Sequence, residues 1–205
     1  MKNKRVLVVL GGTSGERSVS LDSGKACIKA LKKRNYNVST FDPKKRTLNL
    51  INKNKIDIIF NALHGKDGED GVAQSYFEYL RIPYTHSGVL SSYNAMNKEI
   101  SKKIFNRSKI KTPIYFVLKK KYWNKKLITK NIKSKKMKFP IVVKPINEGS
   151  SIGVKICKNI KELIKMSKYL FQKYESLIFE VFIGGQEIQV AVIGNLPLGA
   201  IELKP

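Results

Sequence analysis

The chain has few cysteines and no long apolar run, and both absences limit what it can be. Its 205 residues include two cysteines, Cys27 and Cys157. These show no metal-ligand spacing and are too few for a disulfide framework, so a reducing, cytoplasmic setting is expected. No segment approaches ~18 uninterrupted apolar residues, so the sequence predicts no membrane span. The apolar part of the N-terminal MKNKRVLVVLGG is too short for a signal peptide.

Acidic residues are also scarce, with 15 Asp and Glu against 40 Lys and Arg, a net charge of +25. Such an excess is typical of nucleic-acid binding. However, arginine supplies only 6 of the 40, and no arginine–aromatic interleaving accompanies the 16 basic residues between Lys98 and Lys138. Lysine, isoleucine (23) and asparagine (15) are abundant while alanine (7) is rare, which indicates AT-rich codon usage. We therefore expect no nucleic-acid partner, although a basic surface attracts anionic nucleotides.

The chain begins with a buried strand, RVLVVL at 5–10, followed by the glycine-rich turn GGTSGE. A helix to about residue 33 is expected next, capped by Ser18 or Ser20. The turn lacks the G-x-G-x-x-G spacing of a dinucleotide site. Its Glu16 would repel a phosphate but can receive an ammonium group. The alternative, more common for a single residue, is a glutamate stabilised by the helix dipole.

The second motif is the octapeptide HGKDGEDG at 64–71, which follows an apolar strand expected over 56–63. In open α/β sheets, ligand-binding groups lie at the carboxyl ends of strands, where His64 falls. A metal site is a weaker alternative, because the loop has tightly spaced acids and no second histidine; its members would be His64, Asp67, Glu69 and Asp70. The neighbouring expected elements are a strand over 38–41, a helix over 71–81, a short strand over 82–85 and a helix over 89–108.

The third motif is IVVKPINEGSSIG at 141–153. Pro145 cannot continue a sheet ladder, so the strand is expected to stop there. The glycines and serines that follow give a loop whose N–H groups can approach an anion, with Lys144 beside it. These residues indicate a phosphate-binding loop or, equally, a polar hairpin with a lysine at its base.

The second half of the chain is predicted to be rich in strands. Strands are expected over 112–118, 141–145, 154–157, 177–182, 187–193 and 198–203, with a solvated connection over 119–138 that has room for a short helix. An amphipathic helix is expected over 159–174.

Taken together, these motifs resemble those of the D-alanine–D-alanine ligases of the ATP-grasp superfamily. The matching segments are GGTSGERSVSLDSG at 11–24, HGKDGEDG at 64–71, IPYTHSG at 82–88, MNK at 96–98, VVKPINEGSSIGV at 142–154, and the pair Glu180 and Glu187. The resemblance is nearly collinear from residue 5, and the H-G-x-x-G-E-D-G pattern is highly specific to this family.

The resemblance implies an α/β fold in three parts. These are an N-terminal Rossmann-like (pre-ATP-grasp) parallel-sheet domain over 1–95, the small α+β lid subdomain of an ATP-grasp fold over 96–183, and the beginning of the C-terminal ATP-grasp subdomain over 184–205. A homodimer formed through the N-terminal domain is also implied.

The implied activity is ATP-dependent ligation of two D-alanines through a D-alanyl phosphate, in the cytoplasm, with Mg²⁺ or Mn²⁺ as cofactor. The product serves peptidoglycan synthesis, cell-wall biogenesis and cell shape. D-Ala–D-Ser and D-Ala–D-lactate ligases share the same motifs. The alternatives outside this class are a non-catalytic nucleotide-binding remnant and a basic interaction module.

The resemblance also implies roles for single residues. For ATP these are Lys98 and Lys144 on the phosphates, Ser150, Ser151 and Gly153 in the closing loop, Glu148 in the same site, Glu180 at the adenine and Glu187 at the ribose. For the first D-alanine these are Glu16 at the ammonium group with Val19 beside it, His64 near the carboxylate, and Ser150, which fixes Glu16.

Two departures from the family pattern change what is expected. Val181 stands where many members carry a lysine near the adenine. The sequence stops at Pro205, before the family's mobile tyrosine loop, its substrate-binding arginine and its magnesium ligands. No metal ligand is therefore assigned, phosphoryl transfer by this chain is expected to be severely impaired, and the chain is interpreted as an incomplete ligase.

Overall fold

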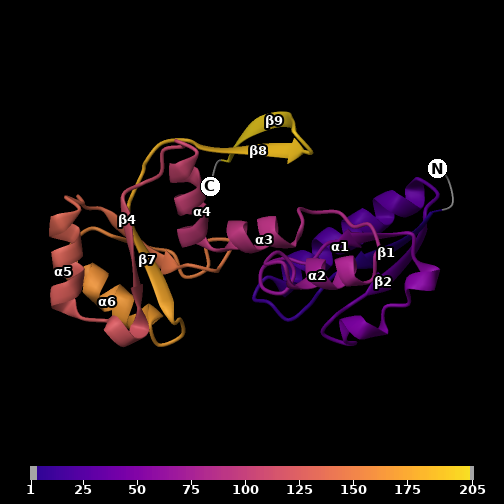
Figure 1. The fold of residues 1–205 in the computed structure, drawn as a ribbon, viewed down its shortest axis with the longest axis horizontal. Helices are drawn as coiled ribbons and strands as arrows, with labels where there is room; N and C mark the ends of the chain where they lie inside the picture. Colours follow the sequence, from indigo (N-terminus) through magenta and orange to yellow (C-terminus); the bar gives the residue numbers. More distant parts are fainter. Residues whose placement is uncertain (1–3, 204–205) are drawn as a thin grey trace.

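The computed structural model describes residues 4–203, which form three separate β-sheets (Figure 1). The strand orders are β2-β1-β3, β4-β7-β5-β6 and β8-β9. In Figure 1 the first sheet lies on the right and the second on the left, with α3 and α4 between them. None of the helices within the described residues is long and apolar enough to cross a membrane.

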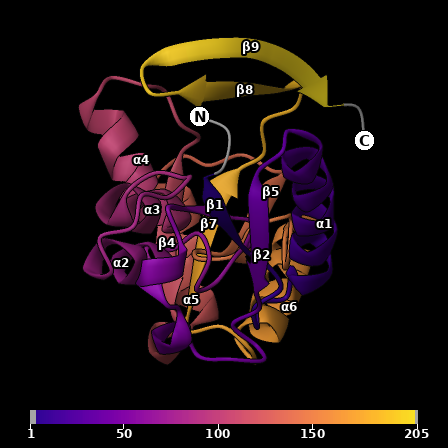
Figure 2. The ribbon, with the colours of Figure 1, turned by 90° about the vertical axis from the view of Figure 1, so that its right-hand side faces the viewer.

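The first sheet is parallel, with β1 (Arg5–Val9) between β2 (Asn37–Phe41) and β3 (Ile58–Asn61). Side chains of β1 alternate between its two faces. Val6 and Val8 pack with α1 (Arg17–Lys33), whereas Leu7 and Val9 pack with α2 (Val72–Tyr79). Figure 2 shows these helices on opposite sides of the sheet. The short strand expected over 82–85 is a single bridge between Ile59 and Tyr84.

Helix α1 begins earlier than its sequence predicts, and the proposed serine caps were wrong. The helix starts at Arg17, and Glu16 occupies the N-cap without a side-chain capping bond. Ser20 lies inside the helix, where its hydroxyl donates to the carbonyl of Ala62 at 2.6 Å and accepts from the N–H of Gly11 at 2.8 Å. Bonds between distant segments therefore take the hydroxyl that local capping would have used.

The single helix expected over 89–108 is two helices, α3 (Val89–Met96) and α4 (Lys98–Arg107). Asn97 interrupts them with an extended backbone, and its side-chain oxygen accepts from the N–H groups of Glu99 at 3.0 Å and Ile100 at 3.1 Å. Asparagine is among the best N-cap residues, so the break is encoded locally. It makes Lys98 the first residue of α4.

The second sheet is antiparallel and consists of β4 (Tyr115–Lys119), β7 (Ser176–Val181), β5 (Ile141–Pro145) and β6 (Lys155–Cys157). Helices α5 (Lys125–Ser134) and α6 (Ile160–Leu170) cover one face of it. Their shared core includes Phe116, Ile128, Ile141, Val143, Leu163, Leu177 and Phe179. Strand β5 ends at Pro145 as predicted, while α5 lies within the connection expected over 119–138.

The third sheet is a hairpin of β8 (Glu187–Ile193) and β9 (Leu196–Leu203), drawn in yellow above the other elements in Figure 1. Every described residue of the two strands is exposed, on both faces. The remaining elements are short 3-10 turns at Leu48–Leu50, Lys53–Lys55 and Lys120–Tyr122.

The close approach of α1 to the end of β1 gives a stability prediction. A Cβ atom at Gly24 would lie 2.7 Å from the Cβ of Leu10. In an open helix Gly→Ala stabilises by up to about 1 kcal/mol, but overpacking costs about 1–3 kcal/mol. We expect Gly24→Ala to lower the free energy of unfolding, measured by urea titration, by about 1 kcal/mol. Lys29→Ala, an exposed control on the same helix, should change it by less than about 0.5 kcal/mol. A stabilised Gly24→Ala would contradict this packing.

Candidate functional site

A cavity of about 800 Å³ lies between α4 and the face of the second sheet that α5 and α6 leave uncovered. One part of its lining is apolar and includes Ile104, Phe105, Ile110 and Pro113. The other part is charged and consists of Lys98, Lys102, Lys111, Lys144 and Glu180. The structure therefore brings Lys98, Lys144 and Glu180 to one cavity, as expected for parts of one site.

The pleat of the sheet explains why Lys144 and Glu180 meet. On β5 and β7, Val143 and Phe179 point into the core, so Lys144 and Glu180 point to the opposite face. Antiparallel pairing places Lys144 opposite Ile178, and Glu180 is then its diagonal neighbour. The two side chains form an ion pair there.

Glu180 is a buried carboxylate held by two lysines. Lys144 binds Oε1, and the Nζ of Lys102 lies 2.9 Å from Oε2. Burial raises the pKa of Glu180, but the hydrogen bonds from Lys144 and Lys102 outweigh it and leave the pKa below its usual value. The carboxylate is thus ionised at neutral pH. Sequence reasoning missed Lys102, although its position four residues after Lys98 places both on one face of a helix.

Lys98 provides a half-buried ammonium group at the same cavity. Its Nζ donates to the backbone carbonyl of Glu148. Burial lowers its pKa, and the nearby charge of Lys144 lowers it further. Lys98 in the first turn of α4 and Lys144 on β5 line the same cavity and favour an anionic ligand, and the helix dipole adds to the charge of Lys98.

The loop 149–153 follows β5 and folds back on itself. Ile152 donates to the carbonyl of Gly149 at 2.9 Å, and Val154 donates to that of Ser151 at 3.2 Å. Within residues 4–203, the N–H groups of Ser150, Ser151 and Gly153 donate to no other group. Free N–H groups in a tightly turned loop of this kind can bind an anion.

The same loop carries backbone strain. Ser150 and Ser151 have φ of 44° and 59°, the left-handed region that costs about 1–2 kcal/mol for each L-residue. Such conformations persist where the surroundings hold them, and they concentrate at functional sites. Here the hydroxyl of Ser150 is held by a hydrogen bond to Oε1 of Glu16.

Glu16 is 6% exposed, and no lysine, arginine or histidine pairs with it in the described part of the chain. Gly65 closes over its carboxylate with φ of 68°, and a Cβ atom there would lie 2.4 Å from Oε2. Gly149 approaches from the loop, where a Cβ atom would lie 3.3 Å from the same oxygen. A buried carboxylate without a cation is costly, so this pocket suits a ligand that brings a positive charge.

The turn that presents Glu16 is fixed by an ion pair. Nη2 of Arg17 lies 2.7 Å from Oδ2 of Asp42, and Nη1 donates to the carbonyl of Gly12 at 2.7 Å. The N–H of Gly12 in turn donates to Oδ1 of Asp42 at 3.1 Å. The hydrogen bonds from Arg17 lower the pKa of Asp42 to about 2. Sequence reasoning missed this pair, because its members lie 25 residues apart.

Other predicted site residues lie at the edges of this arrangement. Nε2 of His64 lies 3.3 Å from Oγ of Ser23, and Nδ1 lies 3.5 Å from Oε1 of Glu69. Val19, in the first turn of α1, is 47% exposed. Glu187 lies at the start of the exposed hairpin and does not line the cavity that holds Lys144.

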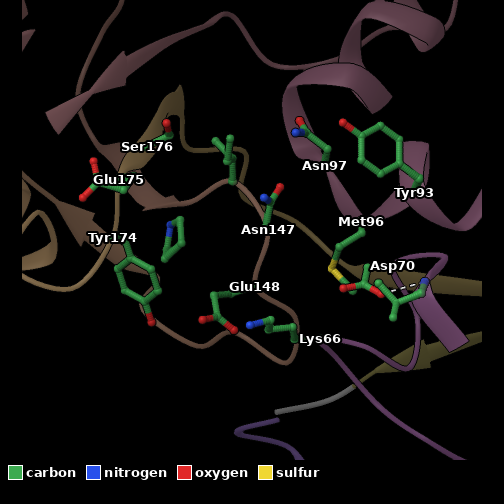
Figure 3. A pocket seen from close by; sticks show the side chains of 13 residues that line it. Lys66, Asp70, Tyr93, Met96, Asn97, Asn147, Glu148, Tyr174, Glu175 and Ser176 are labelled. Atoms are coloured by element: carbon green, nitrogen blue, oxygen red, sulfur yellow. Dashed lines mark hydrogen bonds between the residues drawn. The ribbon is translucent and has the colours of Figure 1, made fainter. Parts of the chain in front are cut away.

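Glu148 faces a second cavity, of about 450 Å³ (Figure 3). Consecutive residues separate the two cavities, since Lys144 lines the first and Pro145 lines the second. The ammonium group of Lys66 points toward the Glu148 carboxylate in Figure 3. The backbone carbonyl of Glu148 therefore accepts from Lys98, while its side chain lines the second cavity.

Metal ligands do not gather in the described part of the chain. Within residues 4–203, no group of three or more His, Cys, Asp or Glu side chains could hold a metal ion. This includes the alternative built on His64, Asp67, Glu69 and Asp70, which the structure does not support. The site supplies positive groups for an anion rather than ligands for a metal.

The chain matches two family models. Residues 41–87 match the N-terminus of D-ala D-ala ligase, and residues 104–204 match its C-terminus. A D-alanine–D-alanine ligase of Pelagibacter ubique is 51% identical over 204 residues. That alignment covers 98% of this chain and 65% of the relative. The chain thus spans about 65% of the length of this relative and of the D-alanine–D-alanine ligase B of Mesorhizobium japonicum, which is 43% identical.

Solved structures of ligases are also similar to this chain in sequence and fold. The D-alanine–D-alanine ligase of Bacillus anthracis complexed with ATP is 34% identical, with a TM-score of 0.82, and the match covers 98% of this chain and 66% of that one. The VanG D-Ala:D-Ser ligase of Enterococcus faecalis is 26% identical, with a TM-score of 0.79, covering 98% and 68%.

The Arg17–Asp42 pair predicts a pH-dependent stability. The pKa of Asp42 falls from 3.8 to about 2 on folding, so the pair stabilises the fold fully above about pH 4 and loses this effect as the pH falls to about 2. Asp42→Asn should lower the free energy of unfolding by about 2 kcal/mol at neutral pH. Urea titrations from about pH 7 to about pH 3 should show this difference shrinking.

The control for this experiment is Asp22→Asn, whose side chain is 76% exposed and pairs with Lys25 at 3.3 Å. It should change stability by less than about 0.5 kcal/mol at any pH. A loss in Asp42→Asn that is constant with pH would mean that packing, not the charge, is responsible.

Proposed function

The chain belongs to the D-alanine–D-alanine ligase family, and we propose that it carries the ATP-phosphate site and the first D-alanine site of a ligase that joins two D-alanines. One observation supports this above all others. Ser150 lies in the loop beside Lys98 and Lys144, and its hydroxyl reaches Glu16 on the first sheet's helix. A phosphate and an amino acid bound at these places would be neighbours.

In the proposed reaction, a carboxylate oxygen of the first D-alanine attacks the γ-phosphorus of ATP and ADP leaves. The amine of the second D-alanine then attacks the acyl phosphate, expels phosphate and loses a proton. Lys98, Lys144 and the N–H groups of the loop would neutralise the transferred phosphate. Glu16 would hold the ammonium group, so that the carboxylate lies against the loop. The folded loop would keep water from the acyl phosphate.

Further roles extend this proposal. The adenine would occupy the apolar part of the larger cavity with Glu180 at its edge, and Glu187 would receive the ribose hydroxyls. Val19 would lie beside the first D-alanine, and His64 near its carboxylate. Ser151 and Gly153 would bind phosphate through their N–H groups, and Glu148 would orient Lys98 through its carbonyl.

The proposal includes Mg²⁺ or Mn²⁺, which would screen the ATP phosphates when bound. Residues 4–203 offer no ligand group for it, so none of the steps assigned to this chain depends on the metal. We also propose the domain division at 1–95, 96–183 and 184–205, a homodimer through the first domain, a cytoplasmic location, and a role in peptidoglycan synthesis.

Two alternatives remain distinct and testable. A nucleotide-binding protein without ligase activity would bind ATP without D-alanine-dependent phosphate release. Salt-sensitive DNA binding without ATP binding would instead indicate a basic interaction module. Within the enzyme class, the similarity to a D-Ala:D-Ser ligase means that D-serine and D-lactate must be tested as second substrates.

Lys144 tests the phosphate site. Lys144→Ala removes one of two ammonium groups facing the phosphates and should weaken ATP binding, measured by calorimetry, by at least about tenfold. Lys155→Ala removes an exposed lysine from the adjacent strand and should change the affinity by less than about twofold. Equal affinities in all three proteins would refute the phosphate-site assignment.

Glu16 tests the amino-acid site. Glu16→Gln keeps the size of the side chain but removes the charge, so D-alanine binding should weaken by about tenfold or more while ATP binding stays unchanged. Glu78→Gln, at an exposed glutamate of α2, is the control. Calorimetry with each ligand, together with D-alanine-dependent phosphate release, separates the two effects. If Glu16→Gln bound D-alanine normally, the ammonium would have to bind elsewhere.

A further inference from the structure

Lys102 is a buried lysine that the proposed reaction does not use. It lies on α4 one turn beyond Lys98, and its side chain is 10% exposed. Its Nζ lies 2.9 Å from Oε2 of Glu180 and 5.1 Å from the centre of the Tyr115 ring. A lysine is rarely kept out of water unless it compensates a buried charge. The ion pair with Glu180 therefore compensates the cost of burying Lys102.

The two lysines that bind Glu180 are placed differently. Lys144 lies at the end of β5, immediately before the segment that leads to the loop, and its charge acts on Lys98. Lys102 lies on the other side of the carboxylate, between α4 and β4. A phosphate bound at the proposed site would compete with Glu180 for Lys144, whereas Lys102 would stay paired with the carboxylate.

We propose that Lys102 is a positioning residue that holds Glu180 as an oriented carboxylate when phosphates engage Lys144, and so selects a base with an amino group over one with a carbonyl group. This rests on the proposed ATP site. An ionised carboxylate only accepts hydrogen bonds. The 6-amino group of adenine donates to it, whereas the 6-carbonyl group of hypoxanthine presents a second acceptor and leaves the buried carboxylate oxygen unpaired.

The groups around Glu180 support separate roles for Lys102, which holds the carboxylate, and Lys144, which binds phosphate. The charged and titratable groups that face it are Lys98 and Lys102 from α4, Lys144 from β5 and Tyr115, its partner on β4, and Lys111 lines the same cavity from the segment after α4. None of these groups is acidic. If Lys102 is lost and Lys144 turns to the phosphates, burial is no longer outweighed and the pKa of Glu180 rises.

The test compares ATP with inosine triphosphate, whose base is hypoxanthine. Lys102→Met keeps the buried methylenes but not the charge. It should raise the Kd for ATP by about tenfold and that for inosine triphosphate by less than about threefold, so that the preference for ATP falls. In Lys102→Met this preference should also decrease as the pH falls from about 8 to about 6, whereas in the unchanged chain it should stay constant. Lys102→Arg should restore both properties.

The control is Lys103→Met, the same substitution on the neighbouring residue of α4, whose side chain is 57% exposed and pairs with Glu99 at 2.7 Å. It should leave the nucleotide preference and its pH profile unchanged. If Lys102→Met does not fold, Lys102→Gln serves instead, because it retains a polar donor without charge.

The outcomes are distinguishable. An unchanged preference and a flat pH profile in a folded Lys102→Met or Lys102→Gln protein, with ATP still bound, would overturn the role of Lys102 alone. Equal loss for both nucleotides would also overturn it, since that result indicates general damage to the cavity. If the unchanged chain bound neither nucleotide, the proposed ATP site itself would fail, and this inference with it.

Discussion

Two buried carboxylates, Glu16 and Glu180, constrain the rest of the site, because each needs a positive partner away from water. The protein itself supplies two lysines to Glu180. For Glu16, residues 4–203 supply only the hydroxyl of Ser150. The two carboxylates therefore differ in kind: Glu180 is neutralised within the cavity wall, whereas Glu16 suits the proposed ammonium group of a ligand.

Much of the fold can be predicted from the sequence, because strand ends and glycine loops depend on local residues. Strand β5 stops at Pro145 as predicted, and the alternating pattern of β1 reports its two covered faces. The break at Asn97 was local too, but it was overlooked within an otherwise helical pattern. The role of Ser20 could not be foreseen, because its hydroxyl bonds two segments that only the folded sheet brings together.

The site was predicted less completely, and the reason is the high lysine content. Among 16 basic residues between 98 and 138, the buried Lys102 differs in the sequence from the exposed Lys103 only by its spacing of four residues from Lys98. That spacing becomes informative only when the helix face that meets Glu180 is known. For the same reason the net charge says little about function. The informative lysines are the few that are shielded from water and paired with a carboxylate, such as Lys102 and Lys144 with Glu180.

Ser150 connects these observations. Its left-handed backbone turns its N–H away from internal bonds, while its hydroxyl reaches across to Glu16. A loop with ordinary backbone angles would satisfy its own N–H groups and offer fewer donors to a phosphate. The strain at Ser150 and Ser151 is therefore coupled to the contact with the first sheet's helix. If a phosphate and an amino acid bind on the two sides of Ser150 as proposed, each should change the affinity for the other, since both sites depend on one backbone conformation.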